Sequence, residues 1–184
     1  MKQLAFALAL AGTCVLSLSA NSTPASALET YEAKMEASSA AALGRSDMID
    51  AFGTDELKPG KYLWRDVPAE AGPERVVVSL GDQHAYLYRG NTLMAVATIS
   101  SGKSGHDTPT GIFSVLDKRE MYRSKKYDNA PMPFMQRIDQ YGIALHAGFN
   151  PGQPASHGCV RLPKDFARKL YGVTDLGTPI YIGS

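Results

Sequence analysis

The stretch RVVVSLGD at residues 75–82 indicates the fold class, because a β-branched run ends there in the turn residues Gly81 and Asp82. Further short apolar stretches follow between turn signals, at residues 84–88, 93–99, 111–116, 133–138, 141–146 and 179–182. Short strands without helix-length spacers are typical of largely antiparallel sheets. We therefore predict a mainly β domain over residues 73–184, with antiparallel sheets in a sandwich or barrel-like arrangement.

One short helix is predicted near the C-terminal end of this domain. Pro163 suits its first turn, Asp165 complements its positive end and Gly172 suits its stop. Residues 28–72 begin with a stretch rich in Ala, Glu, Ser and Met that has good helix propensity but only a weak apolar stripe. We predict an N-terminal helical or linker segment there.

The beginning of the chain has the pattern of a secretion signal. Lys2 precedes an apolar run at residues 4–18, and the small residues Ala25-Ser26-Ala27 match a signal-peptidase site. The run is shorter than the ~20 residues that a spanning helix needs. We predict a signal peptide at residues 1–27, a mature start at Leu28, a periplasmic location and no stable membrane insertion after cleavage.

The charge balance limits the possible partners. Lys and Arg number 19 against 18 Asp and Glu, which gives a net charge of +1. A nucleic-acid-binding protein should show a basic excess, so we expect no nucleic-acid partner. The composition is that of a soluble globular protein, and we expect a monomer.

Cysteine usage points to a reactive thiol in the motif SHGCVR at residues 156–161. Cys14 lies in the signal, so Cys159 is the only cysteine of the mature chain, and exported proteins normally use cysteines in pairs. An inert buried cysteine is the alternative. Its Gly, His and Arg neighbours favour a polar, partly open turn in which a thiolate forms and acts as a nucleophile.

Two histidines compete to be the base for this thiol. His157 is two residues away, whereas His146 ends an apolar strand that would hold its ring rigidly, so we favour His146. We interpret His84 and His106 as structural. A zinc site made of His146, His157 and Cys159 is disfavoured, because no CxxC or HxxxH pair is present. We expect no metal and no cofactor.

The other motif residues have expected roles in binding and orientation. Gly158 permits backbone angles at which the amides of Gly158 and Cys159 converge on an oxyanion. Arg161 is either a carboxylate clamp or a member of an ordinary ion pair. Ser156, His157 and Arg161 are expected to contact substrate.

The motif resembles the signature of the YkuD-type L,D-transpeptidases. The stretches SGK at 101–103, TPTGIF at 108–113, APMPF at 130–134 and GIALHAG at 142–148 are also similar to that family. The resemblance covers about residues 73–182, and the Ser-His-Gly-Cys element is highly specific. Residues 73–184 would thus be the catalytic domain.

This resemblance implies acyl transfer on peptidoglycan stem peptides. Cys159 would form a thioester at the L-centre of a diamino acid and release the terminal D-alanine, and an acceptor amine would then form a cross-link. His146 would be the base, oriented by the backbone carbonyl of Ala147. The loop at residues 147–155, with Pro151 and Pro154, is shorter than in many members, so the acceptor stays open. Alternatives are an L,D-carboxypeptidase, with water as acceptor, and a non-catalytic wall-binding protein.

Overall fold

Ten strands in two sheets and two α-helices make up the described part of the chain. The structure is a computed structural model that describes residues 28–184, so the predicted signal peptide at residues 1–27 lies outside the described residues. The elements are α1 (Tyr31–Phe52), β1 (Tyr62–Trp64), a 3-10 turn (Ala69–Ala71), β2 (Glu74–Ser79), β3 (His84–Arg89), β4 (Thr92–Thr98), β5 (Gly111–Ser114), β6 (Asp117–Arg123), β7 (Pro131–Arg137), β8 (Ala144–Ala147), β9 (Val160–Leu162), α2 (Lys164–Val173) and β10 (Pro179–Gly183).

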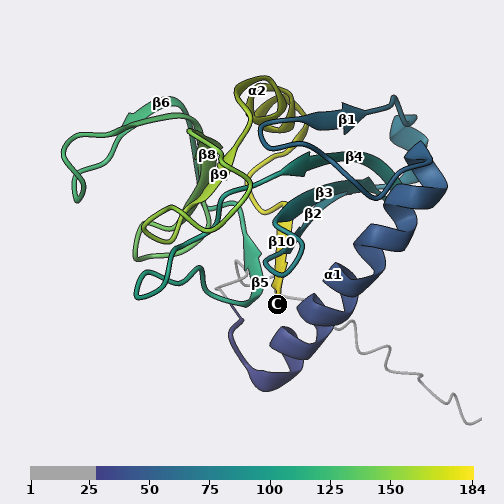
Figure 1. The fold of residues 1–184 in the computed structure, drawn as a ribbon, viewed down its shortest axis with the longest axis horizontal. Helices are drawn as coiled ribbons and strands as arrows, with labels where there is room; N and C mark the ends of the chain where they lie inside the picture. The colour runs from purple at the N-terminus through teal and green to yellow at the C-terminus, as the bar shows by residue number, and fades with distance from the viewer. Residues whose placement is uncertain (1–27) are drawn as a thin grey trace, which may run out of the picture.

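The strands form a six-stranded sheet in the order β1-β4-β3-β2-β10-β5 and a four-stranded sheet in the order β6-β7-β8-β9. Most neighbours are antiparallel, and the predicted mainly β fold class is confirmed. Two pairs depart from the antiparallel pattern, because β2 pairs with β10 and β8 pairs with β9 in parallel. Figure 1 shows the second sheet on the left, away from α1 on the right.

The six-stranded sheet is buried on both faces, which explains its unbroken apolar strands. Alternate residues of a strand point to opposite faces. Val76 and Val78 accordingly pack into a core with the second sheet and α2, whereas Val77 packs into a separate cluster with Met48 of α1. Two-sided burial requires apolar residues at successive positions rather than at every second one.

Helix α2 lies where the sequence predicted it. Pro163 is its N-cap and Asp165 lies in its first turn, but the helix continues through Gly172 to Val173. The predicted stop at Gly172 was therefore slightly early. The Thr174 hydroxyl hydrogen-bonds the Leu170 carbonyl at 2.7 Å and so completes this end of the helix.

Helix α1 packs against the six-stranded sheet through a stripe of small side chains. Its buried residues are spaced three or four apart and comprise Ala33, Ala37, Ala41, Gly44 and Met48. The stripe looks weak in the sequence because alanine and glycine contribute little hydropathy. Their small size lets the helix approach the sheet closely. Residues 62–64 also belong to this sheet, so the segment before residue 73 is part of the same core.

The approach is close at Gly44, where a Cβ would lie 2.4 Å from the ring of the buried Tyr86. None of the helices in residues 28–184 is long and apolar enough to cross a membrane.

Gly44→Ala should destabilise the protein, even though alanine is the better helix former. The methyl group has no space beside Tyr86, and overpacking costs about 1–3 kcal/mol. Gly172→Ala is the matched control, because a Cβ there meets no atom within 4 Å. That change should stabilise α2 by up to about 1 kcal/mol. The free energy of unfolding in urea measures both, and a neutral or stabilising Gly44→Ala would contradict the packing.

Candidate active site

The parallel pairing of β8 with β9 brings Cys159 and His146 into one cavity. Leu145 pairs with Val160 and His146 with Arg161, so Cys159 lies just before β9 and beside the start of β8. His146 is buried and Cys159 is half-buried, and both line a cavity of about 550 Å³. The nucleophile and base expected from the sequence therefore share one site.

The His146 ring is oriented by the backbone of its neighbour. Nδ1 lies 2.9 Å from the carbonyl oxygen of Ala147. A carbonyl only accepts hydrogen bonds, so Nδ1 carries the proton and Nε2 keeps its lone pair. The pKa of His146 is lowered to about 4, mainly by burial; the hydrogen bond to the Ala147 carbonyl partly opposes this, and the Arg161 charge adds to the lowering. The imidazole is neutral at neutral pH and can accept a proton at Nε2.

The Cys159 thiol is protonated at neutral pH, in contrast to the thiolate expected from its sequence neighbours. Burial is the main cause that raises its pKa, and the charge of Asp139 adds to it. The Ala144 backbone and Arg161 act in the opposite direction. The sulfur donates a weak hydrogen bond to the Gly142 carbonyl at 3.8 Å. The resting pair is therefore a neutral thiol and a neutral imidazole.

The turn at residues 156–159 is braced by the Ser156 hydroxyl. Ser156 Oγ accepts from the Gly158 amide at 3.0 Å and donates to the Cys159 carbonyl at 2.5 Å. Gly158 has a φ of 113°, where a side chain would be strained, and a Cβ would lie 2.7 Å from Ile143 Cδ1. The turn thus requires glycine at this position.

This bracing changes two sequence-based interpretations. The Gly158 amide is occupied by Ser156, so of the two amides expected to stabilise an oxyanion, only that of Cys159 remains available. The Ser156 hydroxyl is buried and hydrogen-bonded within the turn, so it holds the turn, and Ser156 also lines the cavity.

His157 points away from the core and lies in a stack of rings. Its ring is stacked on Tyr127 at 4.5 Å and contacts His106 edge-on at 4.7 Å. Desolvation and the nearby charges of Lys103, His106 and Arg161 lower its pKa. His106, which we interpreted as structural, thus lies beside the turn that carries Cys159, although the two are far apart in sequence. His84 lies elsewhere, in a second cavity lined by Arg45 and Asp82.

The cavity gathers positive charge in a nearly neutral chain. Its lining includes Lys125, Lys126, Arg137 and Arg161, but only one carboxylate, that of Asp128. Within residues 28–184, no carboxylate lies within ion-pair distance of Arg161, so the ordinary ion pair considered for it does not form there. Its guanidinium is free to bind an anion. No cluster of three or more His, Cys, Asp or Glu that could hold a metal is found in the same residues.

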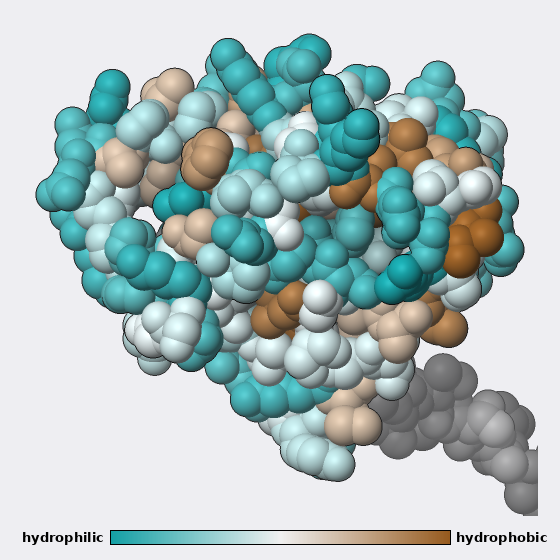
Figure 2. All heavy atoms as spheres, viewed as in Figure 1, coloured by the Kyte–Doolittle hydropathy of each residue, from teal (hydrophilic) through white to brown (hydrophobic). Residues whose placement is uncertain are grey.

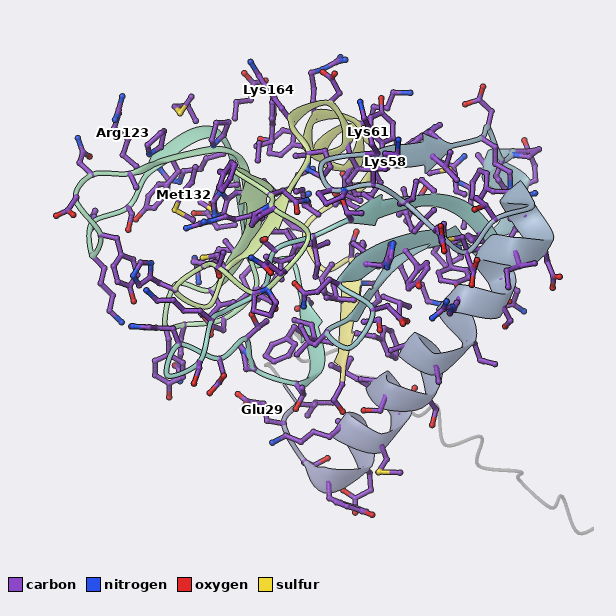
Figure 3. All side chains as sticks on the ribbon, viewed as in Figure 1. Glu29, Lys58, Lys61, Arg123, Met132 and Lys164 are labelled. Carbon is purple, nitrogen blue, oxygen red and sulfur yellow. The ribbon has the colours of Figure 1, made fainter. Side chains whose placement is uncertain are left out.

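The hairpin of β6 and β7 forms one wall of the cavity. The sequence predicted a strand at residues 133–138, within the region of β7, but none at β6. Strand β6 is mostly exposed and polar, so it has no apolar pattern to identify it. Figure 3 shows Met132 on the inner side of the hairpin and Arg123 pointing outward. Figure 2 shows the surface hollowed on the left, beside this hairpin. The exposed rings of Tyr141 and Phe149 complete the rim of the cavity.

Known proteins share both the domain and the fold. A family model of the L,D-transpeptidase catalytic domain, named YkuD, matches residues 73–182. An L,D-transpeptidase from Mycobacterium smegmatis is 20% identical with a TM-score of 0.56, covering 60% of this chain and 58% of its own. One from Stackebrandtia nassauensis is 24% identical with a TM-score of 0.56, covering 65% and 58%.

L,D-transpeptidase 3 from Mycobacterium tuberculosis, in complex with a faropenem-derived adduct, is 19% identical with a TM-score of 0.56, covering 61% and 60%. This chain thus spans less than two thirds of the length of these structures, and at such identities the likeness shows the fold alone. No curated protein matches it. Because the family match extends over more than half of its residues, the chain belongs to the YkuD family of L,D-transpeptidase catalytic domains.

Proposed function

We propose that this protein is an L,D-transpeptidase that cross-links peptidoglycan stem peptides through a thioester on Cys159. The observation that carries the proposal is that Cys159 and a neutral, oriented His146 line the same cavity. A nucleophile and a base whose ring is fixed by a third group are the arrangement needed for covalent acyl transfer.

The acylation step uses the two neutral groups in turn. Cys159 Sγ attacks the carbonyl at the L-centre of the diamino acid while its proton moves to His146 Nε2. The carbonyl oxygen becomes an oxyanion, and the intermediate then collapses. The bond to the terminal D-alanine breaks, and the His146 imidazolium gives its proton to that leaving amine. The products are a thioester on Cys159 and free D-alanine.

In the second step an acceptor amine resolves the thioester. His146 Nε2 removes a proton from the attacking side-chain amine of a second stem, the new amide forms, and the departing Cys159 sulfur is protonated again. With water in place of the amine, the same step releases a trimmed stem, which is the carboxypeptidase reaction.

The charge of the cavity supports a stem peptide as substrate. Stem peptides carry several carboxylates, and Lys125, Lys126 and Arg161 line the cavity. We propose Arg161 as the carboxylate clamp, because its planar guanidinium can bind a carboxylate through two parallel hydrogen bonds. His157 would contact substrate at the edge of the site, whereas Ser156 and Gly158 would shape the turn.

Cys159→Ala should abolish product formation and leave the protein folded, because only a half-buried sulfur is lost. Mass spectrometry of purified muropeptides after incubation identifies the reaction: dimers indicate a transpeptidase, trimmed monomers a carboxypeptidase, and unchanged stems a non-catalytic binder. Near-normal turnover by Cys159→Ala would refute the thioester.

As the pH is lowered, kcat/KM should decrease with a midpoint near pH 4. Protonation of His146 removes the base, and burial keeps its pKa at about 4, so activity should persist as the pH falls below 6 and be lost only around pH 4. His146→Gln should lower kcat by ~10²–10⁴-fold, whereas His157→Gln, at the competing histidine, should lower it much less.

The rate of Cys159 alkylation by iodoacetamide should rise with pH, with a midpoint above the ordinary thiol value of ~8.5, because burial raises the pKa of this thiol. A fast, pH-independent rate down to pH 5 would instead indicate a preformed thiolate and imidazolium.

Peptidoglycan, the substrate of this chemistry, lies outside the cytoplasmic membrane. We propose that residues 1–27 are a signal peptide and that the mature protein starts at Leu28 and works in the periplasm as a monomer. Intact-mass measurement of the exported protein should give the mass of residues 28–184. A mass that includes Met1 to Ala27 would contradict cleavage at this site.

A further inference from the structure

The loop at residues 100–108 is tied to the turn that presents Cys159. The amides of Ala155 and Ser156 both donate to the Ser101 carbonyl at 2.9 Å. The Lys103 amide donates to the Ser156 carbonyl at 3.1 Å. Ser100 and Arg161 form an antiparallel bridge through hydrogen bonds of 3.0 and 2.9 Å. These hydrogen bonds fix the turn at residues 156–159 to the loop at residues 100–108.

Thr108, at the end of this loop, holds the peptide group that precedes Cys159. Its side chain is buried, and its Oγ1 accepts a hydrogen bond from the Gly102 amide at 2.8 Å. The hydroxyl hydrogen remains available and is donated to the Gly158 carbonyl, also at 2.8 Å. One hydroxyl thus connects the supporting loop to the peptide between Gly158 and Cys159.

The orientation of this peptide group fixes the direction of the Cys159 amide. In a planar trans peptide the C=O and N–H bonds point in opposite directions. With the Gly158 carbonyl directed at Thr108, the Cys159 N–H points away from Thr108. Thr108 does not line the cavity, whereas Cys159 does. Within residues 28–184 no acceptor contacts this N–H.

The peptide needs such a restraint because the residue before it is glycine. Gly158 has a φ of 113° and the widest choice of backbone angles of any residue, so its carbonyl can rotate unless it is held. On the C-terminal side of Cys159, the Ser156 hydroxyl donates a hydrogen bond to the carbonyl of Cys159 itself. The two hydroxyls hold the peptide groups on either side of the nucleophile.

We propose that Thr108 is a positioning residue for oxyanion stabilisation: by holding the Gly158 carbonyl, it aims the Cys159 N–H at the oxyanion formed when the thiol attacks a carbonyl. The proposal rests on the proposed function, because it assumes that Cys159 is acylated. An oxyanion donor acts through its preset direction, so a loose peptide would lower the rate of acylation without changing the thiol itself.

Two probes separate these effects. With p-nitrophenyl acetate, the Cys159 sulfur forms a bond to the acetyl carbon, an oxyanion forms, the bond to p-nitrophenolate breaks, and the thiol proton passes to His146. With iodoacetamide, the sulfur displaces iodide from a saturated carbon, the thiol proton passes to His146, and no oxyanion forms. The ratio of the two rate constants therefore reports oxyanion stabilisation, and alkylation alone reports the accessibility and acidity of the thiol.

Thr108→Val keeps the shape of the side chain and removes the hydroxyl. Acylation should fall by about tenfold or more, below the ~10²–10³-fold effect of deleting an oxyanion donor outright, while alkylation stays near the parent rate. Thr108→Ser keeps the hydroxyl and should retain the parent ratio. Thr108→Ala provides a second test if the valine variant is unstable, and its ratio should fall in the same way.

Thr174→Val is the matched control, because Thr174 is also buried and its hydroxyl oxygen also lies within hydrogen-bond distance of two groups, the Leu170 carbonyl and the Gln136 side chain. Thr174→Val should lower the free energy of unfolding without changing the ratio of the acylation rate constant to the alkylation rate constant. An equal loss of acylation and alkylation in Thr108→Val and Thr108→Ala, or no loss of acylation, would overturn the positioning role. A parent protein that is alkylated but never acylated would instead refute the proposed function.

Discussion

The parallel ladder between β8 and β9 is the constraint on which the site depends. It places His146 on β8 and Cys159 directly before β9, so the strand pairing fixes the base and the thiol relative to each other. Parallel neighbours need a long connection, and here residues 148–159 supply it without a helix. The connection ends in the turn that carries Cys159, which is why its bracing by Ser156 and by the loop at residues 100–108 matters.

Burial gives the site a reactive pair that is neutral at rest. Placing both groups in a partly closed cavity lowers the pKa of His146 and raises that of Cys159, so neither group carries a charge before substrate arrives. Charge develops only during attack, when the thiol proton reaches Nε2 and an oxyanion forms. In the proposed mechanism, the Cys159 N–H would stabilise the negative charge where it develops. An exposed thiolate, by contrast, would be open to oxidation.

The parts of the fold that were predictable are those with strong local signals. Val76 to Val78 and their neighbouring strands are β-branched and apolar, and α2 has a proline at its start. Strand β6 lacked any such signal, because its residues are polar and its place depends on pairing with β7. The buried face of α1 was obscured because it is made of alanine and glycine, whose contribution is close contact rather than hydropathy. In the site, Ser156 to Arg161 were identified because they adjoin in sequence. His106, Tyr127 and Thr108 reach the same place only through tertiary structure, and the effect of burial on the thiol cannot be read from its neighbours in the chain.

The position of β10 has a consequence for the order in which the protein can fold. This strand lies between β2 and β5 in the six-stranded sheet, although β2 and β5 both precede it by a long stretch of sequence. The sheet stays open at that place until Gly183 has left the ribosome, and α1, which packs across β10, has no complete surface to dock on before then. Contacts between residues so far apart in sequence are slow to form. The six-stranded sheet therefore cannot close until residues 179–183 are present, and the docking of α1 depends on a strand that comes more than a hundred residues after it.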